Sequence, residues 1–252
     1  YTSQNALQRP ATTYESHDVF IRVIAVNGEG QEHLNVLRKI ARGPESFRCN
    51  NHALPMLYEI HLEDIVFGVF ALVDASMTVA YNYWPKNSVG DLLDMTLQML
   101  EALDFIHGLN IAHRWQLESL LEGKKTIGRP RVSLIDFENA IQFPPEYSEK
   151  QCIVSGHPIG GSFTDAAEYA RPSPPECATG KPYNAFKLDV WQLGSSLKDF
   201  KTNITSIDGI LDRLRQPDCV LRPRAGEAFD SLKKIGDSMS SDSLSFAPPK
   251  VR

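Results

Sequence analysis

The sequence predicts a bilobal α+β chain, with a small β-rich N-lobe followed by a larger helical C-lobe. Runs of β-branched residues, which favour strands, are concentrated before residue 73. After residue 88 the apolar residues recur at the spacing of amphipathic helices. The 252 residues, 42% of them hydrophobic, are enough for one large domain or for two lobes with a core. The expected division is a polar segment (1–18), an N-lobe (19–73), a C-lobe (74–235) and a Ser/Asp/Pro-rich, disordered tail (236–252).

The N-lobe is expected to contain a strand, a helix and then two further strands. Residues 19–26 (Val-Phe-Ile-Arg-Val-Ile-Ala-Val) are rich in β-branched residues and predict the first strand. After a glycine-containing turn, apolar residues recur at helical spacing over residues 31–42. Residues 57–62 and 65–72 predict two strands joined by a Glu-Asp turn.

The C-lobe is expected to begin with a long amphipathic helix. Ser88 is a favourable N-cap, and Asp91, three positions later, resembles the second half of a capping box. The helical spacing continues to Gly108, where the helix is expected to stop. Residues 138–183 are rich in Pro, Gly and Ser and predict a long, mostly irregular segment. The remaining predicted elements are a strand over 132–135 and helices over 188–200, 207–214 and 225–235.

Composition and charge exclude several classes of protein. The net charge of −5 predicts no general attraction to nucleic acid or to anionic lipid. The longest apolar run, residues 65–73, is far shorter than the roughly 20 residues of a membrane helix, and the first residues lack the apolar region of a secretion signal. An intracellular protein, cytoplasmic or nuclear, is therefore expected, and the absence of an initiator Met favours a fragment or a processed form. No two of the four cysteines have Cys-x-x-Cys spacing, so reduced thiols are expected rather than a zinc ribbon.

The most informative motifs lie between residues 111 and 138. His113-Arg114-Trp115 follows the predicted long helix, and Asp136-Phe137-Glu138 follows the predicted strand. Protein kinases carry His-Arg-Asp and Asp-Phe-Gly at such places. Three later motifs have kinase-like counterparts in the same order: Arg-Pro-Ser-Pro-Pro-Glu (171–176), Asp-Val-Trp-Gln-Leu-Gly (189–194) and Leu-Arg-Pro-Arg-Ala-Gly-Glu-Ala (221–228).

Over residues 19–232, the chain therefore resembles the eukaryotic protein kinase family. The resemblance implies a bilobal protein kinase-like fold with a truncated N-lobe, because no Gly-x-Gly-x-x-Gly precedes residue 19. It also implies that Asp189 accepts backbone N–H groups of the loop after Arg114. Glu176 and Arg222 are expected to form a buried ion pair. These three residues are structural, not catalytic.

The same resemblance implies a degenerate catalytic loop. In His113, Arg114 and Trp115, the position of the catalytic base is taken by Trp115, whose indole cannot accept a proton. The position of the catalytic-loop Asn, counted without gaps, is Leu120. Residues 115–130 read as a linker, so an alternative is that the catalytic loop was deleted through a splice or gene-model change. No intact catalytic residue is therefore expected.

Some nucleotide-binding positions have counterparts. Arg22 takes the place of the strand Lys, and its helix partner is either Glu32 or His33. Phe70 would lie at the back of a nucleotide cleft, with Ala71 and Leu72 in the hinge. Asp136 is the remaining metal ligand, and Glu138 either adds a second ligand or, as favoured here, faces solvent. ATP and Mg²⁺ are thus possible cofactors.

A kinase-like domain without phosphotransferase activity, a pseudokinase, is therefore the first hypothesis for function. It would act as a binding or regulatory module with a protein partner or substrate, and with no nucleic acid or membrane. The alternative is an active Ser/Thr-type kinase in which Glu118 or Glu138 serves as base or metal ligand. A third hypothesis is a truncated product without independent function. The sequence indicates no oligomeric state.

Overall fold

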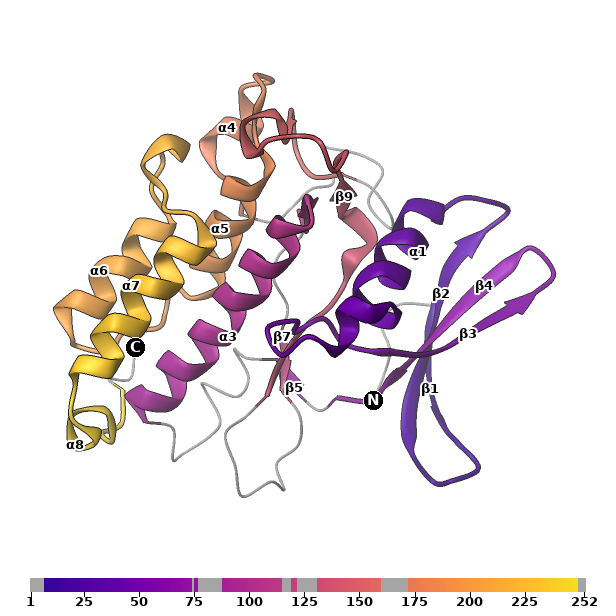
Figure 1. The fold of residues 1–252 in the computed structure, drawn as a ribbon, viewed down its shortest axis with the longest axis horizontal. Coiled ribbons are helices and arrows are strands. Elements are labelled where there is room, and N and C mark those ends of the chain that lie inside the picture. The colour runs from indigo at the N-terminus through magenta and orange to yellow at the C-terminus, as the bar shows by residue number, and fades with distance from the viewer. Residues whose placement is uncertain are drawn as a thin grey trace.

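The computed structural model describes residues 7–73, 75–76, 88–114, 119–121, 131–159 and 172–248. The fold is mixed α+β. A four-stranded antiparallel sheet and the short helix α1 (Gln31–Leu37) lie on one side, and the longer helices gather on the other (Figure 1). Within the described ranges, no helix is both long enough and apolar enough to cross a membrane.

The sheet has the strand order β1 (Gln8–Thr12), β2 (Asp18–Val26), β4 (Ile65–Ala71) and β3 (Met56–Leu62). The three strands predicted over 19–26, 57–62 and 65–72 are confirmed as β2, β3 and β4. The sequence does not predict β1, because Gln-Arg-Pro-Ala-Thr has no apolar alternation. It forms by antiparallel pairing with β2, in which Arg9 lies opposite Ile21. As an edge strand it also tolerates Pro10, which cannot donate a backbone hydrogen bond.

The helical span predicted for residues 31–42 is confirmed, with a change of winding. Helix α1 continues into a π-helical turn, η1 (Arg38–Arg42), and then a 3₁₀ turn, η2 (Pro44–Phe47). Leu34, Leu37 and Ile40 are buried, as their spacing predicts. They pack in the same cluster as Ile24 and Met56 of the sheet.

The long helix α3 (Val89–Gly108) begins and ends where the sequence predicts. Ser88 Oγ accepts from the Asp91 backbone N–H at 3.1 Å, and Asp91 Oδ2 accepts from the Ser88 backbone N–H at 2.8 Å. Each side chain of the capping box therefore satisfies a backbone donor that the helix leaves unpaired.

The remaining elements are short strands and turns around the helices. The predicted irregular segment contains several of them. The predicted helix over 188–200 starts earlier, because Asn184 accepts backbone hydrogen bonds at its beginning. The elements are β5 (Ala75–Ser76), β6 (Ile111–Ala112), β7 (Ser119–Leu121), β8 (Val132–Leu134), η3 (Phe137–Asn139), β9 (Ile141–Gln142), η4 (Glu149–Gln151), β10 (Ile153–Val154), α4 (Pro175–Ala178), β11 (Tyr183–Asn184), α5 (Ala185–Ser196), α6 (Thr205–Leu214), η6 (Cys219–Leu221), α7 (Ala225–Ser238) and α8 (Ser241–Leu244).

The prediction of a disordered tail from residue 236 is wrong over its described part. Helix α7 extends to Ser238, and α8 follows it. The Val89 backbone N–H donates to the Phe246 carbonyl at 3.0 Å, and Leu244 packs against the main hydrophobic cluster. Composition alone suggests disorder, but these few contacts with the start of α3 order the segment.

One hydrophobic core joins the sheet to the helices. It contains Ile24 of β2, Leu34 of α1, Leu103 of α3, Leu193 of α5 and Leu232 of α7, all at most 5% exposed. Such continuous burial couples the two sides mechanically. It also allows a side chain on β2 to meet residues more than 100 positions later.

Candidate functional site

Arg22, on β2, lies at the centre of a cluster of charged side chains. Its Nη1 donates to Asp136 Oδ1 at 2.8 Å, and its Nη2 donates to Glu138 Oε2 at 2.6 Å. All three side chains are largely buried. Burial disfavours the charged guanidinium, but the two carboxylates outweigh that effect and raise the pKa of Arg22. The cluster therefore holds one cation between two anions.

The turn that carries Asp136 and Glu138 is held in place by packing. Asp136 has φ of 68°, in the left-handed region that costs a residue with a Cβ about 1–2 kcal/mol. Phe137, which follows it, is 2% exposed and meets the His113 ring edge-on, with centroids 4.8 Å apart. The His113 ring is fixed in turn, because its Nε2 lies 2.8 Å from the Ile135 carbonyl oxygen. These contacts offset the backbone strain.

The prediction that Glu138 faces solvent is wrong. Its side chain is only 10% exposed and is paired with Arg22. The two residues are 116 positions apart in sequence, so no local pattern indicates their contact. The planar guanidinium has two parallel donor groups, which suits it to bridging two carboxylates.

The α1 position that faces this cluster is His33, not Glu32. His33 is 8% exposed, whereas Glu32 is exposed. Burial, together with the positive charge of Arg22, lowers the pKa of His33 to about 3, although Asp136 partly opposes the shift. Neither residue is bonded to Arg22, whose guanidinium turns to Asp136 and Glu138 instead. Helical spacing could have identified His33, since it lies three, four and seven positions before buried Val36, Leu37 and Ile40.

Neutral His33 predicts a loss of stability in mild acid. Below a pKa of 6.5 the unfolded chain binds a proton at this residue, while the folded chain stays neutral until about pH 3. Stability should therefore fall as the pH drops through this window. Urea unfolding at pH 6 and pH 5 should show wild type losing roughly 1 kcal/mol more per pH unit than His33→Gln. Equal losses for the two proteins would contradict the assignment.

Asp189, on α5, organises the segment that contains His113 and Arg114. Its side chain is fully buried and accepts from the His113 backbone N–H at 2.8 Å and from the Arg114 backbone N–H at 2.7 Å. His107 Nε2 lies 2.9 Å from Asp189 Oδ2, and the His107 ring stacks on Phe186. Asp189 was expected to accept N–H groups of the loop after Arg114, and the observed donors are His113 and Arg114 themselves. His107 is a further partner that the sequence did not indicate.

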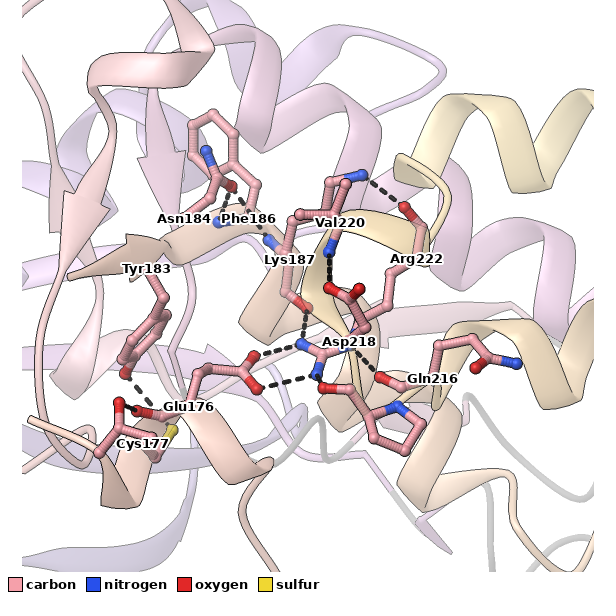
Figure 2. Close-up of polar contacts among 12 residues, drawn as sticks. Glu176, Cys177, Tyr183, Asn184, Phe186, Lys187, Gln216, Asp218, Val220 and Arg222 are labelled. Carbon is pink, nitrogen blue, oxygen red and sulfur yellow. Dashed lines mark hydrogen bonds and ion pairs between the residues drawn. The ribbon is translucent and has the colours of Figure 1, made fainter. Parts of the chain in front are cut away.

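Arg222 and Glu176 form the expected ion pair, which Figure 2 shows in full. Both guanidinium Nη atoms contact the carboxylate, Nη2 at 2.9 Å from Glu176 Oε2. The Arg222 side chain is fully buried and also donates to the carbonyls of Gln216, Lys187 and Pro217 at 2.7–3.2 Å. The Lys187 ammonium donates to the Arg222 carbonyl at 2.5 Å. This network ties α4 and α5 to the segment before α7.

The other predicted site residues are placed as follows. Phe70 is 6% exposed on β4 and stacks on Phe20, with ring centroids 5.1 Å apart. Ala71 ends β4, and the Leu72 backbone N–H donates to the Asp18 carbonyl at 3.1 Å. The backbone of Leu120 belongs to β7. Two of the residues singled out in the sequence, Trp115 and Glu118, lie outside the described residues.

No protein-family model matches the sequence, and no curated protein matches it. In the described ranges, no group of three or more His, Cys, Asp or Glu residues is arranged to hold a metal ion. The chemistry of the Arg22 cluster and the two networks around Asp189 and Arg222 therefore carries the functional argument.

Proposed function

We propose that this chain is a bilobal protein kinase-like domain without phosphotransferase activity, which acts as a binding or regulatory module. The double ion pair of Arg22 with Asp136 and Glu138 carries this proposal. In a kinase, the residues at these positions bind the phosphates and a metal ion. In this chain, the three side chains form ion pairs with one another instead.

Two contacts support the kinase-like part of the proposal. Asp189 accepts the backbone N–H groups of His113 and Arg114, and Arg222 is paired with Glu176. Both contacts are those that the resemblance implies, and both join motifs far apart in the chain. Neither requires a nucleotide, so a domain that has lost catalysis would keep them for stability.

The charge at the cluster supports the inactive part of the proposal. Asp136 and Glu138 carry one more negative charge than Arg22 neutralises, and the terminal nitrogens of Arg22 are already bonded to them. A triphosphate needs cations around it, so it would meet repulsion here. Mg²⁺ would have to compete with Arg22 for Asp136 Oδ1 and Glu138 Oε2. As they are placed, these residues do not fit Mg-ATP.

Thermal unfolding with nucleotide tests the proposal. ATP with or without Mg²⁺ is expected to leave the unfolding temperature unchanged. A ligand present at 100 times its Kd would instead add about 2.7 kcal/mol of stability. An Mg²⁺-dependent rise in wild type would contradict the proposal. A cooperative transition without ligand is the control, since its absence would indicate a product that does not fold.

An Arg22→Met variant tests whether the ion pairs of Arg22 are what prevents Mg²⁺ from binding. Without the guanidinium, Asp136 and Glu138 are left side by side and repel each other, so Mg²⁺ alone should stabilise the variant more than it stabilises wild type. Asp212→Asn is the matched control, because it also disrupts cation–carboxylate pairs, those with Lys201 and Arg215, away from the cluster. Equal Mg²⁺ responses in all three proteins would argue against the ion pairs as the obstacle.

The second candidate function is an active Ser/Thr-type kinase. The observation that favours it is that Asp136 and Glu138 bond to the same guanidinium, which brings two carboxylates close together. Adjacent carboxylates are ligands that Mg²⁺ prefers. Turnover of ATP that is lost on Asp136→Ala would establish this candidate in place of the first.

A further inference from the structure

Strand β3 is an edge strand whose protection against pairing is limited to a bulge between Met56 and Tyr58 and the inward-pointing Glu59. Its sequence, Met-Leu-Tyr-Glu-Ile-His-Leu, contains no Pro, Lys or Arg, the residues that commonly protect edges. Among the described strands, β4 alone pairs with it. Figure 1 shows the β3–β4 hairpin projecting away from the helices. Its free edge is therefore accessible to another strand, as far as the described residues show.

The outer face of this hairpin is apolar, and the part of it that β3 forms is exposed. Gly68 points toward Ile24, Met56 and Phe70 in the core, so its neighbours along β4 point to the opposite, outer face. The register places Tyr58, Ile60 and Leu62 on that outer face, opposite Val69, Phe67 and Ile65. The three β3 side chains are 55%, 45% and 59% exposed, a row of large apolar groups at the edge of the sheet.

The hairpin geometry determines which backbone groups point outward. Leu62 and Ile65 flank a two-residue turn and therefore form a hydrogen-bonded pair. Along β3 the hydrogen-bonded positions alternate, so Leu62, Ile60 and Tyr58 bond to β4. The N–H and C=O groups of Glu59 and His61 then point to the free edge, where no described residue meets them.

The sequence of β3 is complementary to itself in one antiparallel register. With Ile60 opposite Ile60 of a second copy, Tyr58 of each copy lies opposite Leu62 of the other, on the outer face. On the inner face, Glu59 of each copy lies opposite His61 of the other, so an acceptor meets a donor twice. In this register Glu59 and His61 supply the inter-strand backbone hydrogen bonds.

The inner face already contains a Glu59–His61 contact within one chain. The Glu59 side chain is 8% exposed and is paired with Arg38 and Arg42, and its carboxylate lies 2.7 Å from its own His61 Nε2. Hydrogen bonding by Arg38 lowers the pKa of Glu59 to about 2, so it is an anion at neutral pH. His61 remains 58% exposed and able to meet a second carboxylate.

We propose that two copies of this chain associate through their β3 edges, antiparallel and two-fold symmetric about Ile60, to form one continuous eight-stranded sheet. The interface combines backbone hydrogen bonds with an outer apolar stripe and two inner Glu59–His61 pairs. The interface lies apart from the Arg22 cluster, so this proposal does not depend on the proposed function.

Sedimentation of the full chain tests the association. Wild type is expected to reach twice the chain mass of 28.2 kDa with increasing concentration. Ile60→Lys should weaken association at least tenfold, because it buries two lysines against each other at the axis. Val220→Lys, a change at a 78% exposed apolar residue on η6, is the matched control and should dimerise like wild type. A wild-type chain that stays monomeric, or an Ile60→Lys chain that still dimerises, would overturn the proposal.

Disulfide trapping tests the register. Opposite Ile60 residues would form a non-hydrogen-bonded pair with Cα atoms about 4.5 Å apart, within disulfide range. In a Cys49→Ser background, which removes an exposed thiol, Ile60→Cys should therefore cross-link under mild oxidation. Tyr58→Cys is the control, because its Cα lies about 13 Å or more from its counterpart in this register. Cross-linking of Tyr58→Cys as efficient as that of Ile60→Cys would overturn the register.

Discussion

Replacing Arg222 with methionine is expected to lower the free energy of unfolding by about 3–5 kcal/mol. The guanidinium is fully buried, and the change leaves Glu176 without its partner cation. Three carbonyl oxygens, on Gln216, Lys187 and Pro217, also lose their donor. Methionine is an unbranched, uncharged side chain of similar length. The fall in the free energy of unfolding therefore reflects the lost ion pair and hydrogen bonds of Arg222 more than the lost side-chain volume. Urea unfolding monitored by circular dichroism at pH 7 measures it.

Arg224→Met is the matched control for this prediction. Arg224 lies two positions away and pairs with Glu149 at 2.8 Å, but its side chain is 60% exposed. Exposed ion pairs contribute about 0–1 kcal/mol, so this variant should remain close to wild type. A double variant, Arg222→Met with Glu176→Leu, should be less destabilised than the sum of its single changes, because no buried charge is left alone. Equal effects of Arg222→Met and Arg224→Met would contradict the importance of burial.

Asp189→Asn is expected to destabilise the chain by about 2–5 kcal/mol, although it changes only one oxygen to an NH₂ group. The two carboxylate oxygens accept from different backbone donors, Oδ2 from His113 and Oδ1 from Arg114. Either orientation of the asparagine amide places its NH₂ group against one of these N–H groups. Because the site is fully buried, water cannot relieve that repulsion.

Asp208→Asn is the matched control for Asp189→Asn. Asp208 also accepts two hydrogen bonds, from the backbone N–H and the hydroxyl of Thr202, but both reach the same oxygen, Oδ1. Asparagine keeps one such oxygen, so Asp208→Asn should lower the free energy of unfolding by less than about 1 kcal/mol. Amide hydrogen exchange at His113 and Arg114 adds a local measurement, since protection should fall in Asp189→Asn alone. Equal stability of Asp189→Asn and Asp208→Asn would show that it does not matter whether the two hydrogen bonds reach different carboxylate oxygens or the same one.

The sequence predicted most of the regular elements because their causes are local. The capping box of Ser88 and Asp91 determines the start of α3. The β-branched residues of 19–26 predict β2, and the two segments that flank the Glu-Asp turn predict β3 and β4. It missed β1, which forms only because β2 offers an edge. It also predicted disorder for a tail that a few contacts with the start of α3 hold in place. Both errors concern segments whose order comes from a partner and not from their own composition.

For the candidate site, motif order in the sequence indicated which distant residues meet. The pairing of Glu176 with Arg222 and the hydrogen bonds of Asp189 were expected, because each motif has a known neighbour in the family that the chain resembles. The partners of Arg22 were not expected. The resemblance placed Arg22 at the position of the strand Lys and so suggested Glu32 or His33 as its partner, and Glu138 was predicted to face solvent.

By itself, the sequence thus determined the α+β class, the bounds of the long helix α3 and the identity of the residues from which a site could be made. Periodicity, capping and turns act over a few residues, and a sequence displays them directly. Only the tertiary structure decided that Arg22 bridges Asp136 and Glu138, that His33 is the buried α1 neighbour, and that the outer edge of β3 is unpaired among the described strands. Each of these depends on the packing of segments up to 116 positions apart, where burial and charge pairing outweigh local preference.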